Sequence, residues 1–177
     1  MSTTQGEAPR SDSMATMERV VILGRGGSGK STLAATLGTA TGLPVIELDK
    51  HFWGPGLEAT PPEKWATLQA EFAQADQWIM DGDLGPHDVL EVRLRRADTV
   101  ILLDYPFWPC AWRALRRSRE RLDFWLWLWS WRRRSRPLLL KTVTDHAGNA
   151  TLHVLRNPHA TAAFIAQVKA RQEPGKP

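Results

Sequence analysis

The stretch from 19 to 32, which reads RVVILGRGGSGKST, constrains the fold of this 177-residue chain more than any other. Its four consecutive apolar residues, 20–23, are typical of a strand that is buried on both faces of a parallel sheet. A glycine-rich loop follows at once, and the sequence after that loop favours a helix. A buried strand, a glycine loop and a helix in direct succession predict the first unit of a parallel α/β sheet.

The loop of this unit fits the pattern G-x-x-x-x-G-K-[ST] from Gly24 to Ser31. Glycine-rich stretches often serve only as turns, but the strand and the helix around this one favour a phosphate-binding loop. In such a loop successive backbone N–H groups point at phosphate oxygens, and the helix dipole supports the same contact. Lys30 would contact the β- and γ-phosphates, and the Ser31 hydroxyl would ligate Mg²⁺. The predicted nucleotide-binding residues of the loop are Gly24, Gly26, Gly27, Ser28, Gly29, Lys30, Ser31 and Thr32.

Composition limits the class of protein. With 42% hydrophobic residues, the chain is long enough to bury one sizeable core. The single cysteine, Cys110, excludes an internal disulfide and favours a reducing, cytoplasmic location. The apolar run 124–131 is shorter than the roughly 20 residues that span a bilayer as a helix. We expect one globular domain over 18–170, a disordered leader over 1–17 and a flexible tail over 171–177.

Positive charge is concentrated in one segment of the chain. Residues 113–136 contain nine arginines and two acidic residues, so the segment carries a net charge of +7. Since the whole chain carries +4, the remainder is mildly acidic. A basic segment on such a body suits a phosphate-bearing ligand as well as a polynucleotide.

The rest of the chain alternates between strand and helix patterns. Further strands are predicted at 45–48, 78–80, 99–103 and 151–155. Helices are predicted over 30–41 and 89–96. Four more are predicted to start at a capping box at Thr60–Glu63, at Phe107, after Pro137 and at Asn157–Pro158. Five strands that alternate with helices predict a three-layer α/β/α domain with a parallel sheet.

Three of the predicted strands end in an aspartate, at Asp49, Asp81 and Asp104. An aspartate in such a place often only caps the next helix. Ligands of parallel α/β sheets, however, bind at the carboxyl ends of the strands, where the phosphate loop also lies. One carboxylate there would hold magnesium, and a second would accept a proton from an attacking hydroxyl.

Several of these segments together resemble a known family. They are GRGGSGKST at 24–32, LDKHFWGPG at 48–56, WIMDGD at 78–83, VRLRRADTVILLDYP at 92–106 and RRRSRP at 132–137. With them the chain resembles the adenylate-kinase-like P-loop NTPases, and most closely the FlaR-like, or DNA topology-modulation, proteins. The resemblance implies a five-stranded parallel sheet of order 2-3-1-4-5. It also implies a kinase that uses ATP and Mg²⁺ and acts on a small molecule or nucleotide.

The same resemblance implies roles for single residues. Asp81 would bind magnesium through water, and Asp49 would accept the proton of the acceptor. Arg93 would face the acceptor. Asp104 would only cap the helix that starts after Pro106.

Arginines complete the implied site. Arg113 and Arg117 lie four apart on one helix face and would contact the adenine ring and the phosphates. The predicted catalytic residues are Lys30, Asp49, Asp81 and Arg117. The run 124–136 would begin a lid-side helix whose tryptophans pack on the body. Its arginines, Arg132, Arg133, Arg134 and Arg136, would partly face the phosphates, with Arg133 as a predicted nucleotide contact.

The sequence departs from the family pattern in the lid region near 118–136, which is short. A short lid excludes water less well, which argues against efficient transfer. Slow ATP hydrolysis and a smaller or differently held acceptor are both consistent with such a lid. The alternative is a nucleotide-binding regulator that contacts DNA or a membrane surface through its Trp/Arg segment. The acceptor, the choice between ATP and GTP, and the oligomeric state stay open.

Overall fold

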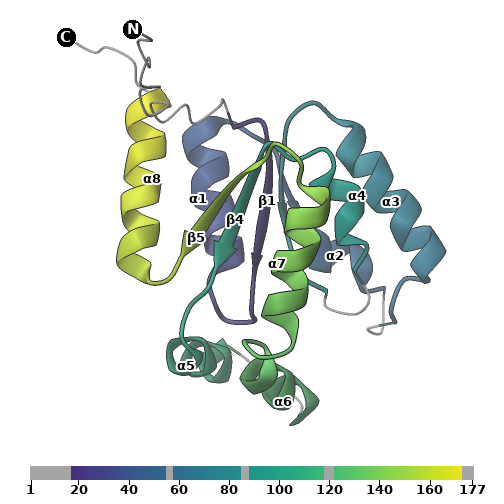
Figure 1. Cartoon of the computed structure of the whole chain (residues 1–177), viewed down its shortest axis with the longest axis vertical. Helices are drawn as coiled ribbons and strands as arrows, with labels where there is room; N and C mark the ends of the chain where they lie inside the picture. Colours follow the sequence, from purple (N-terminus) through teal and green to yellow (C-terminus); the bar gives the residue numbers. More distant parts are fainter. Residues whose placement is uncertain (1–16, 55–57, 85–87, 118–121, 173–177) are drawn as a thin grey trace, which may run out of the picture.

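The computed structural model of the chain describes residues 17–54, 58–84, 88–117 and 122–172. At its centre lies a five-stranded, fully parallel sheet with the order β2-β3-β1-β4-β5 (Figure 1). The strands are β1 (Arg19–Gly24), β2 (Val45–Glu47), β3 (Trp78–Asp81), β4 (Thr99–Leu103) and β5 (Thr151–Leu155). Both the predicted fold class and the predicted strand order are confirmed.

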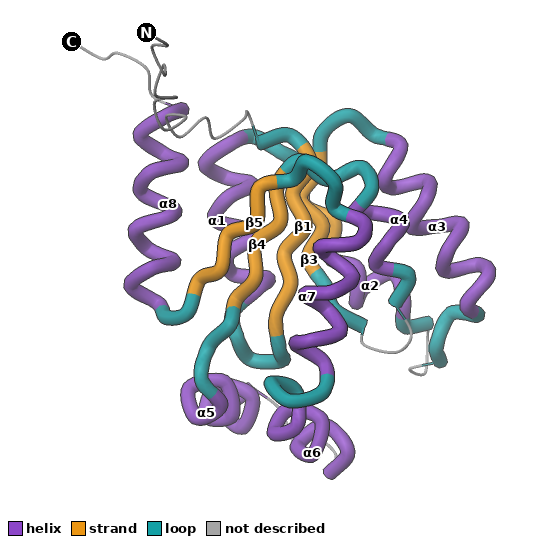
Figure 2. Tube along the Cα trace, in the orientation of Figure 1, coloured by secondary structure: helices purple, strands orange, loops and turns teal. Residues whose placement is uncertain are grey.

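Helices cover both faces of the sheet, as Figure 2 shows. Helices α1 (Lys30–Thr41) and α8 (Pro158–Gln172) lie on one face. The other face carries α3 (Pro62–Gln74), α4 (Leu90–Leu94) and α7 (Ser135–His146). The chain thus forms three layers with the sheet in the middle.

The apolar run of β1 explains why both faces are covered. Val20 and Ile22 belong to the core cluster that holds Leu33 of α1. Val21 and Leu23 belong to the cluster on the other face. Because successive side chains of a strand point to opposite faces, a continuous apolar run supplies both cores at once.

Two helices lie beyond the carboxyl ends of the strands, at the lower end of Figure 1. They are α5 (Phe107–Arg117) and α6 (Leu122–Ser130). The short helix α2 (Leu48–Phe52) directly follows β2. In the part of the chain that the structure describes, no helix is both long and apolar enough to cross a membrane.

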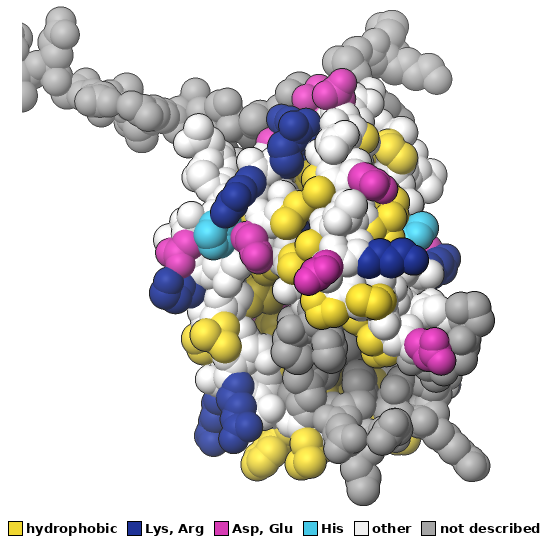
Figure 3. All heavy atoms as spheres, turned by 90° about the vertical axis from the view of Figure 1, so that its right-hand side faces the viewer, with side chains coloured by type: hydrophobic (Ala, Val, Ile, Leu, Met, Phe, Trp, Pro, Cys, Tyr) yellow, Lys and Arg dark blue, Asp and Glu magenta, His cyan; other side chains and the backbone are white. Residues whose placement is uncertain are grey.

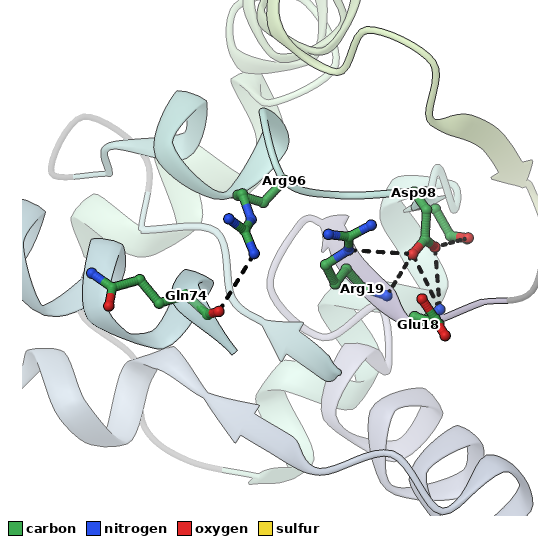
Figure 4. Close-up of polar contacts among 6 residues, drawn as sticks. Glu18, Arg19, Gln74, Arg96 and Asp98 are labelled. Carbon is green, nitrogen blue, oxygen red and sulfur yellow. Dashed lines mark hydrogen bonds and ion pairs between the residues drawn. The ribbon is translucent and has the colours of Figure 1, made fainter. Parts of the chain in front are cut away.

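Asp98 fixes the amino-terminal edge of the sheet (Figure 4). Its carboxylate accepts hydrogen bonds from the backbone N–H groups of Glu18, at 3.2 Å, and Arg19, at 2.8 Å. It also accepts one from the Thr99 hydroxyl at 2.8 Å. These bonds join the start of β1 to the start of β4, and so fix the strand that carries the phosphate-binding loop.

Two local predictions were wrong. Thr60 does not begin a capping box, because its hydroxyl donates instead to the Phe52 carbonyl at 2.6 Å and α3 starts after Pro61. The run 124–136 is not one helix, since α6 ends at Ser130 and α7 begins at Ser135. Pro137 has no N–H to donate within a continuous helix but fits the first turn of α7, which accounts for the break.

Candidate active site

The phosphate-binding loop connects β1 to α1 as the sequence predicts. Gly27 has a φ of 72° and Gly29 a φ of 96°, conformations that residues other than glycine adopt only with strain. The carbonyl of Cys110 in α5 approaches Gly27 so closely that a Cβ atom there would overlap its oxygen. Helix α5 therefore packs directly on the loop.

Gly27→Ala tests this packing. We expect a loss of at least about 1–2 kcal/mol from the positive φ, a further loss from the overlap with Cys110, and weaker nucleotide binding. Gly42→Ala is the matched control, because Gly42 has a φ of 78° but no atom within 4 Å of an added Cβ. Urea unfolding and ATP titration compare the two variants. Equal effects in both assays would show that the contact with α5 is unimportant.

Lys30, the first residue of α1, and Asp81, the last residue of β3, lie together beside this loop. The Lys30 Nζ atom donates to the Gly24 carbonyl at 3.0 Å and lies 3.4 Å from that of Arg25. Asp81 is only 4% exposed, and its Oδ1 atom has no hydrogen-bond partner within the described residues. Ser31 lies close enough to the same carboxylate to lower its pKa. The structure thus brings together three residues that the sequence assigned to phosphate and magnesium.

The ionisation of Asp81 follows from this setting. Burial raises the pKa of Asp81, an effect that the Lys30 ammonium and the Ser31 hydrogen bond partly offset. The carboxylates of Asp49 and Glu47 raise the pKa further. A bound cation would supply the positive charge and the ligand that this carboxylate lacks.

Asp49 lies close enough to Asp81 to act on its pKa but in a different environment. β2 ends at Glu47, so Asp49 does not end a strand as expected but stands in the first turn of α2. Its side chain is exposed. One carboxylate of the pair is therefore buried beside the phosphate loop, and the other is open to solvent.

The sequence predicted that Asp104 would cap α5, but its carboxylate has other partners. Its buried carboxylate accepts hydrogen bonds from the Nε atoms of Arg136, at 3.0 Å, and Arg132, at 3.4 Å. Asp104 thereby joins the end of β4 to the turn before α7 and to the first turn of α7. Two of the arginines predicted to face phosphates are thus paired within the protein.

Arg25 is a residue of the site that sequence reasoning missed. It is 1% exposed, and its guanidinium lies 5.0 Å from the ring centre of the buried Trp131. None of its three side-chain nitrogens has a hydrogen-bond partner among the described residues. Burial lowers the pKa of Arg25, and the nearby charge of Arg132 lowers it further. In the sequence, the only signal that pointed to Arg25 was its position inside the glycine-rich loop.

Arg93 does not face an open acceptor site. Its side chain is fully buried, and its guanidinium donates to both Asp88 oxygens, at 2.7 and 2.8 Å. It also donates to Gln69 Oε1 at 2.7 Å and to the Gly82 carbonyl at 2.8 Å. The prediction that Arg93 contacts the acceptor is corrected, because its charge is matched inside the protein.

A cavity of about 380 Å³ opens beside the phosphate loop. Ser28, Gly29 and Thr32 line it on the side of the loop and α1. Arg113 of α5 and Pro158 of α8 line it on the other sides. The cavity is of a size that small ligands occupy in proteins, and it continues from the loop that would hold phosphates.

Arg113 is held at the cavity by two contacts. Its guanidinium lies 5.6 Å from the ring centre of Tyr105 and 3.4 Å from the Ser28 carbonyl. The Tyr105 hydroxyl is itself hydrogen-bonded to the Thr161 hydroxyl at 2.7 Å. The predicted arginine therefore lies where a planar group in the cavity would meet it.

Other predicted residues lie elsewhere. Arg133 is exposed and does not line the cavity, and its backbone N–H donates to the Ser130 carbonyl at 3.0 Å. The side chain of Arg117, the lid residues 118–121, the leader 1–16 and the tail 173–177 lie outside the described residues.

No model of a known protein family matches the chain, and no curated protein sequence matches it. Solved structures share its fold. Shikimate kinase from Acinetobacter baumannii, in complex with shikimate, is 16% identical with a TM-score of 0.60, covering 86% of this chain and 91% of that one. A gluconokinase from Sinorhizobium meliloti 1021 is 19% identical with a TM-score of 0.52, covering 88% and 91%. Deoxyadenosine kinase from M. mycoides with bound dCTP is 16% identical with a TM-score of 0.50, covering 84% and 96%.

Proposed function

We propose that this protein is an ATP-dependent phosphotransferase that acts on a small molecule or a nucleotide. The observation that carries the proposal is the complete phosphate loop with the buried carboxylate of Asp81 on one side and the open cavity on the other. The structures of similar fold are kinases of small molecules and nucleosides by their names, which supports the same reaction class. The alternative of a DNA- or membrane-contacting regulator receives no support from them.

The nucleotide would occupy the loop and the cavity together. Backbone N–H groups of the loop and the Lys30 ammonium would hold the phosphates. The adenine ring would enter the cavity between Arg113 and Pro158, where the guanidinium can stack on a flat base. Arg117 and Arg133 would be further phosphate contacts.

Ser31 and Asp81 fit a magnesium ion. A hydroxyl and a carboxylate are oxygen ligands of the kind that Mg²⁺ prefers, and the Oδ1 atom of Asp81 has no partner among the described residues. When bound, the ion would neutralise charge on the phosphates during transfer. Asp81 would hold it directly or through water, with Lys30 on the same phosphates.

Asp49 would serve the acceptor. An acceptor hydroxyl would form a bond to the γ-phosphorus as the bond from that phosphorus to the β,γ-bridging oxygen breaks. The exposed Asp49 carboxylate would accept the proton of the hydroxyl. If the acceptor is water, the same arrangement hydrolyses ATP slowly.

Two finer assignments belong to the same proposal. The sequence segments that resemble the FlaR-like proteins support membership of that group within the P-loop kinase fold. The single cysteine, which is buried and unpaired, supports a cytoplasmic location.

Lys30→Ala tests nucleotide binding. We expect ATP affinity to fall by at least about tenfold, since the variant loses a charge-assisted contact worth about 1.5–3 kcal/mol. The fold should persist, because the Lys30 side chain packs in neither core cluster. Calorimetric titration measures the affinity, and circular dichroism checks the fold. Lys141→Ala, which removes an exposed lysine paired with Asp145 on α7, is the control. Unchanged affinity in Lys30→Ala would refute the assignment of the loop.

A further inference from the structure

Helix α5 presents its large apolar side chains to solvent and its small ones to the protein. Cys110, Ala111 and Ala114 form its buried face. Small residues are required there, because the helix backbone touches the phosphate loop at Gly27. The outward face carries large residues at the helical spacing i, i+4, i+7, namely Trp108, Trp112 and Leu115, which are 79%, 61% and 61% exposed.

Helix α6 continues this surface. Leu126 and Trp129 are 66% and 69% exposed, whereas Leu128 and Trp131 are buried. Helices α5 and α6 are in contact at the same end of the molecule (Figure 1). We call the exposed side chains of Trp108, Trp112, Leu115, Leu126 and Trp129 the tryptophan face. Single exposed apolar residues are ordinary, but a group of five on two adjacent helices marks an interaction surface.

Positive charge lies next to the tryptophan face. Arg116 lies 5.7 Å from the ring centre of Trp112. Arg134, in the turn after α6, is also exposed and has no role in the proposed nucleotide site. The segment 113–136 carries a net charge of +7 with its two acidic residues, Glu120 and Asp123, included, and the nearby Asp104 is buried and already paired. At the lower end of the molecule in Figure 3, hydrophobic and basic side chains lie beside each other.

We propose that the tryptophan face binds the surface of a bilayer that contains anionic phospholipid. Tryptophan rings have an apolar body and an N–H group, which suits the boundary between headgroups and acyl chains. Leu115 and Leu126 would enter the apolar side, and the arginines would meet lipid phosphates. The helices would lie in the plane of the interface. This inference does not depend on the proposed kinase activity.

Charge and side-chain type favour lipid over two other partners. A second copy joined through the same face would bring two segments that each carry a net charge of +7 against each other, and like charges repel. A single-stranded polynucleotide would stack its bases on aromatic rings, but two of the five exposed residues are leucines, which offer no ring for a base. An anionic bilayer accepts the aromatic, aliphatic and cationic groups together.

Co-sedimentation with vesicles tests the proposal. The full chain should bind vesicles of phosphatidylcholine and phosphatidylglycerol, bind phosphatidylcholine alone more weakly, and lose affinity as sodium chloride increases. Brominated lipid in the anionic vesicles should quench part of the tryptophan emission. The Trp108→Gln/Trp112→Gln variant should bind at least about tenfold more weakly, since two large rings no longer enter the interface.

Three further variants sharpen the test. Leu152→Gln changes an exposed leucine on β5 and should bind like the wild type, whereas Leu115→Gln should bind more weakly. Arg116→Gln should bind less tightly at low salt and with a smaller salt dependence. Circular dichroism of each variant checks that the fold persists.

Three results would overturn the proposal. The first is an absence of vesicle binding by a folded wild-type chain. The second is a dimer in analytical ultracentrifugation that the double tryptophan variant abolishes, without lipid binding. The third is salt-dependent binding of a fluorescent oligonucleotide, again without lipid binding.

Discussion

Asp49→Asn should abolish phosphoryl transfer while leaving Mg-ATP affinity nearly unchanged. The asparagine is nearly isosteric but cannot accept the proton of the acceptor, so we expect the rate to fall by about 10²–10⁴-fold. Because Asp49 is exposed and stands on α2, outside the phosphate loop, nucleotide binding should persist. Transfer from labelled ATP to a panel of metabolites measures the rate, and calorimetry measures the affinity.

Asp81→Asn is the matched comparison, since the same chemical change falls on the buried member of the pair. It should weaken Mg-dependent nucleotide binding and turnover with every acceptor, including water. Equal loss of Mg-ATP affinity in both variants would mean that the two carboxylates share one role, contrary to our assignment.

The raised pKa of Asp81 gives this comparison a pH signature. Because burial raises that pKa, protons compete with magnesium at a higher pH than for an ordinary aspartate. Mg-ATP affinity of the wild type should therefore decrease as the pH falls, and Asp81→Asn should lose that dependence. A carboxyl whose pKa is raised on folding stabilises the fold at low pH and loses that contribution as the pH rises. At neutral pH, Asp81→Asn should thus make the ligand-free protein more stable.

The sequence was most informative where structure depends on nearby residues. The apolar run of β1, the glycine loop and the start of α1 at Lys30 follow from local spacing, and the structure confirms them. The end of α1 at Gly42 and the Asn157 side chain that caps α8 are equally local. Each depends on contacts within a few positions along the chain.

Partners far apart in the sequence were not predictable in the same way. Asp104 is bonded to arginines 28 and 32 positions away, whereas the sequence pattern around it indicates only a local capping role. Arg93 is paired with Gln69, 24 positions away, besides its neighbour Asp88. Which arginines stay free for phosphate depends on such pairs. The clustering of arginines in the sequence therefore did not reveal that Arg132 and Arg136 are paired with Asp104.

Arg93→Met should be among the most destabilising single changes in this chain. The substitution keeps much of the side-chain volume but leaves the Asp88 carboxylate, only 5% exposed, without its cation. Loss of one partner of a buried ion pair typically costs about 3–5 kcal/mol. Urea unfolding measures the effect. Lys141→Met, which breaks the exposed pair with Asp145, is the control and should change stability far less.

The pH dependence of the same variant distinguishes a lost ion pair from lost packing. Burial acts to raise the pKa of Asp88, but the Arg93 guanidinium and the hydrogen bonds from Arg93 and Gln69 hold it below the ordinary value. A carboxyl with a lowered pKa stabilises the fold above its unfolded pKa of about 3.9, and this contribution is lost as the pH falls through the folded value. Without Arg93, burial should instead raise the pKa of Asp88, so acidification toward that value should stabilise the variant. In Arg93→Met the free energy of unfolding should therefore rise as the pH falls from the raised pKa of Asp88 toward about 3.9. In the wild type the Asp88 contribution should stay constant over that range and be lost only below about 3.9. Parallel pH profiles in the two proteins would show that Arg93 contributes packing and not charge.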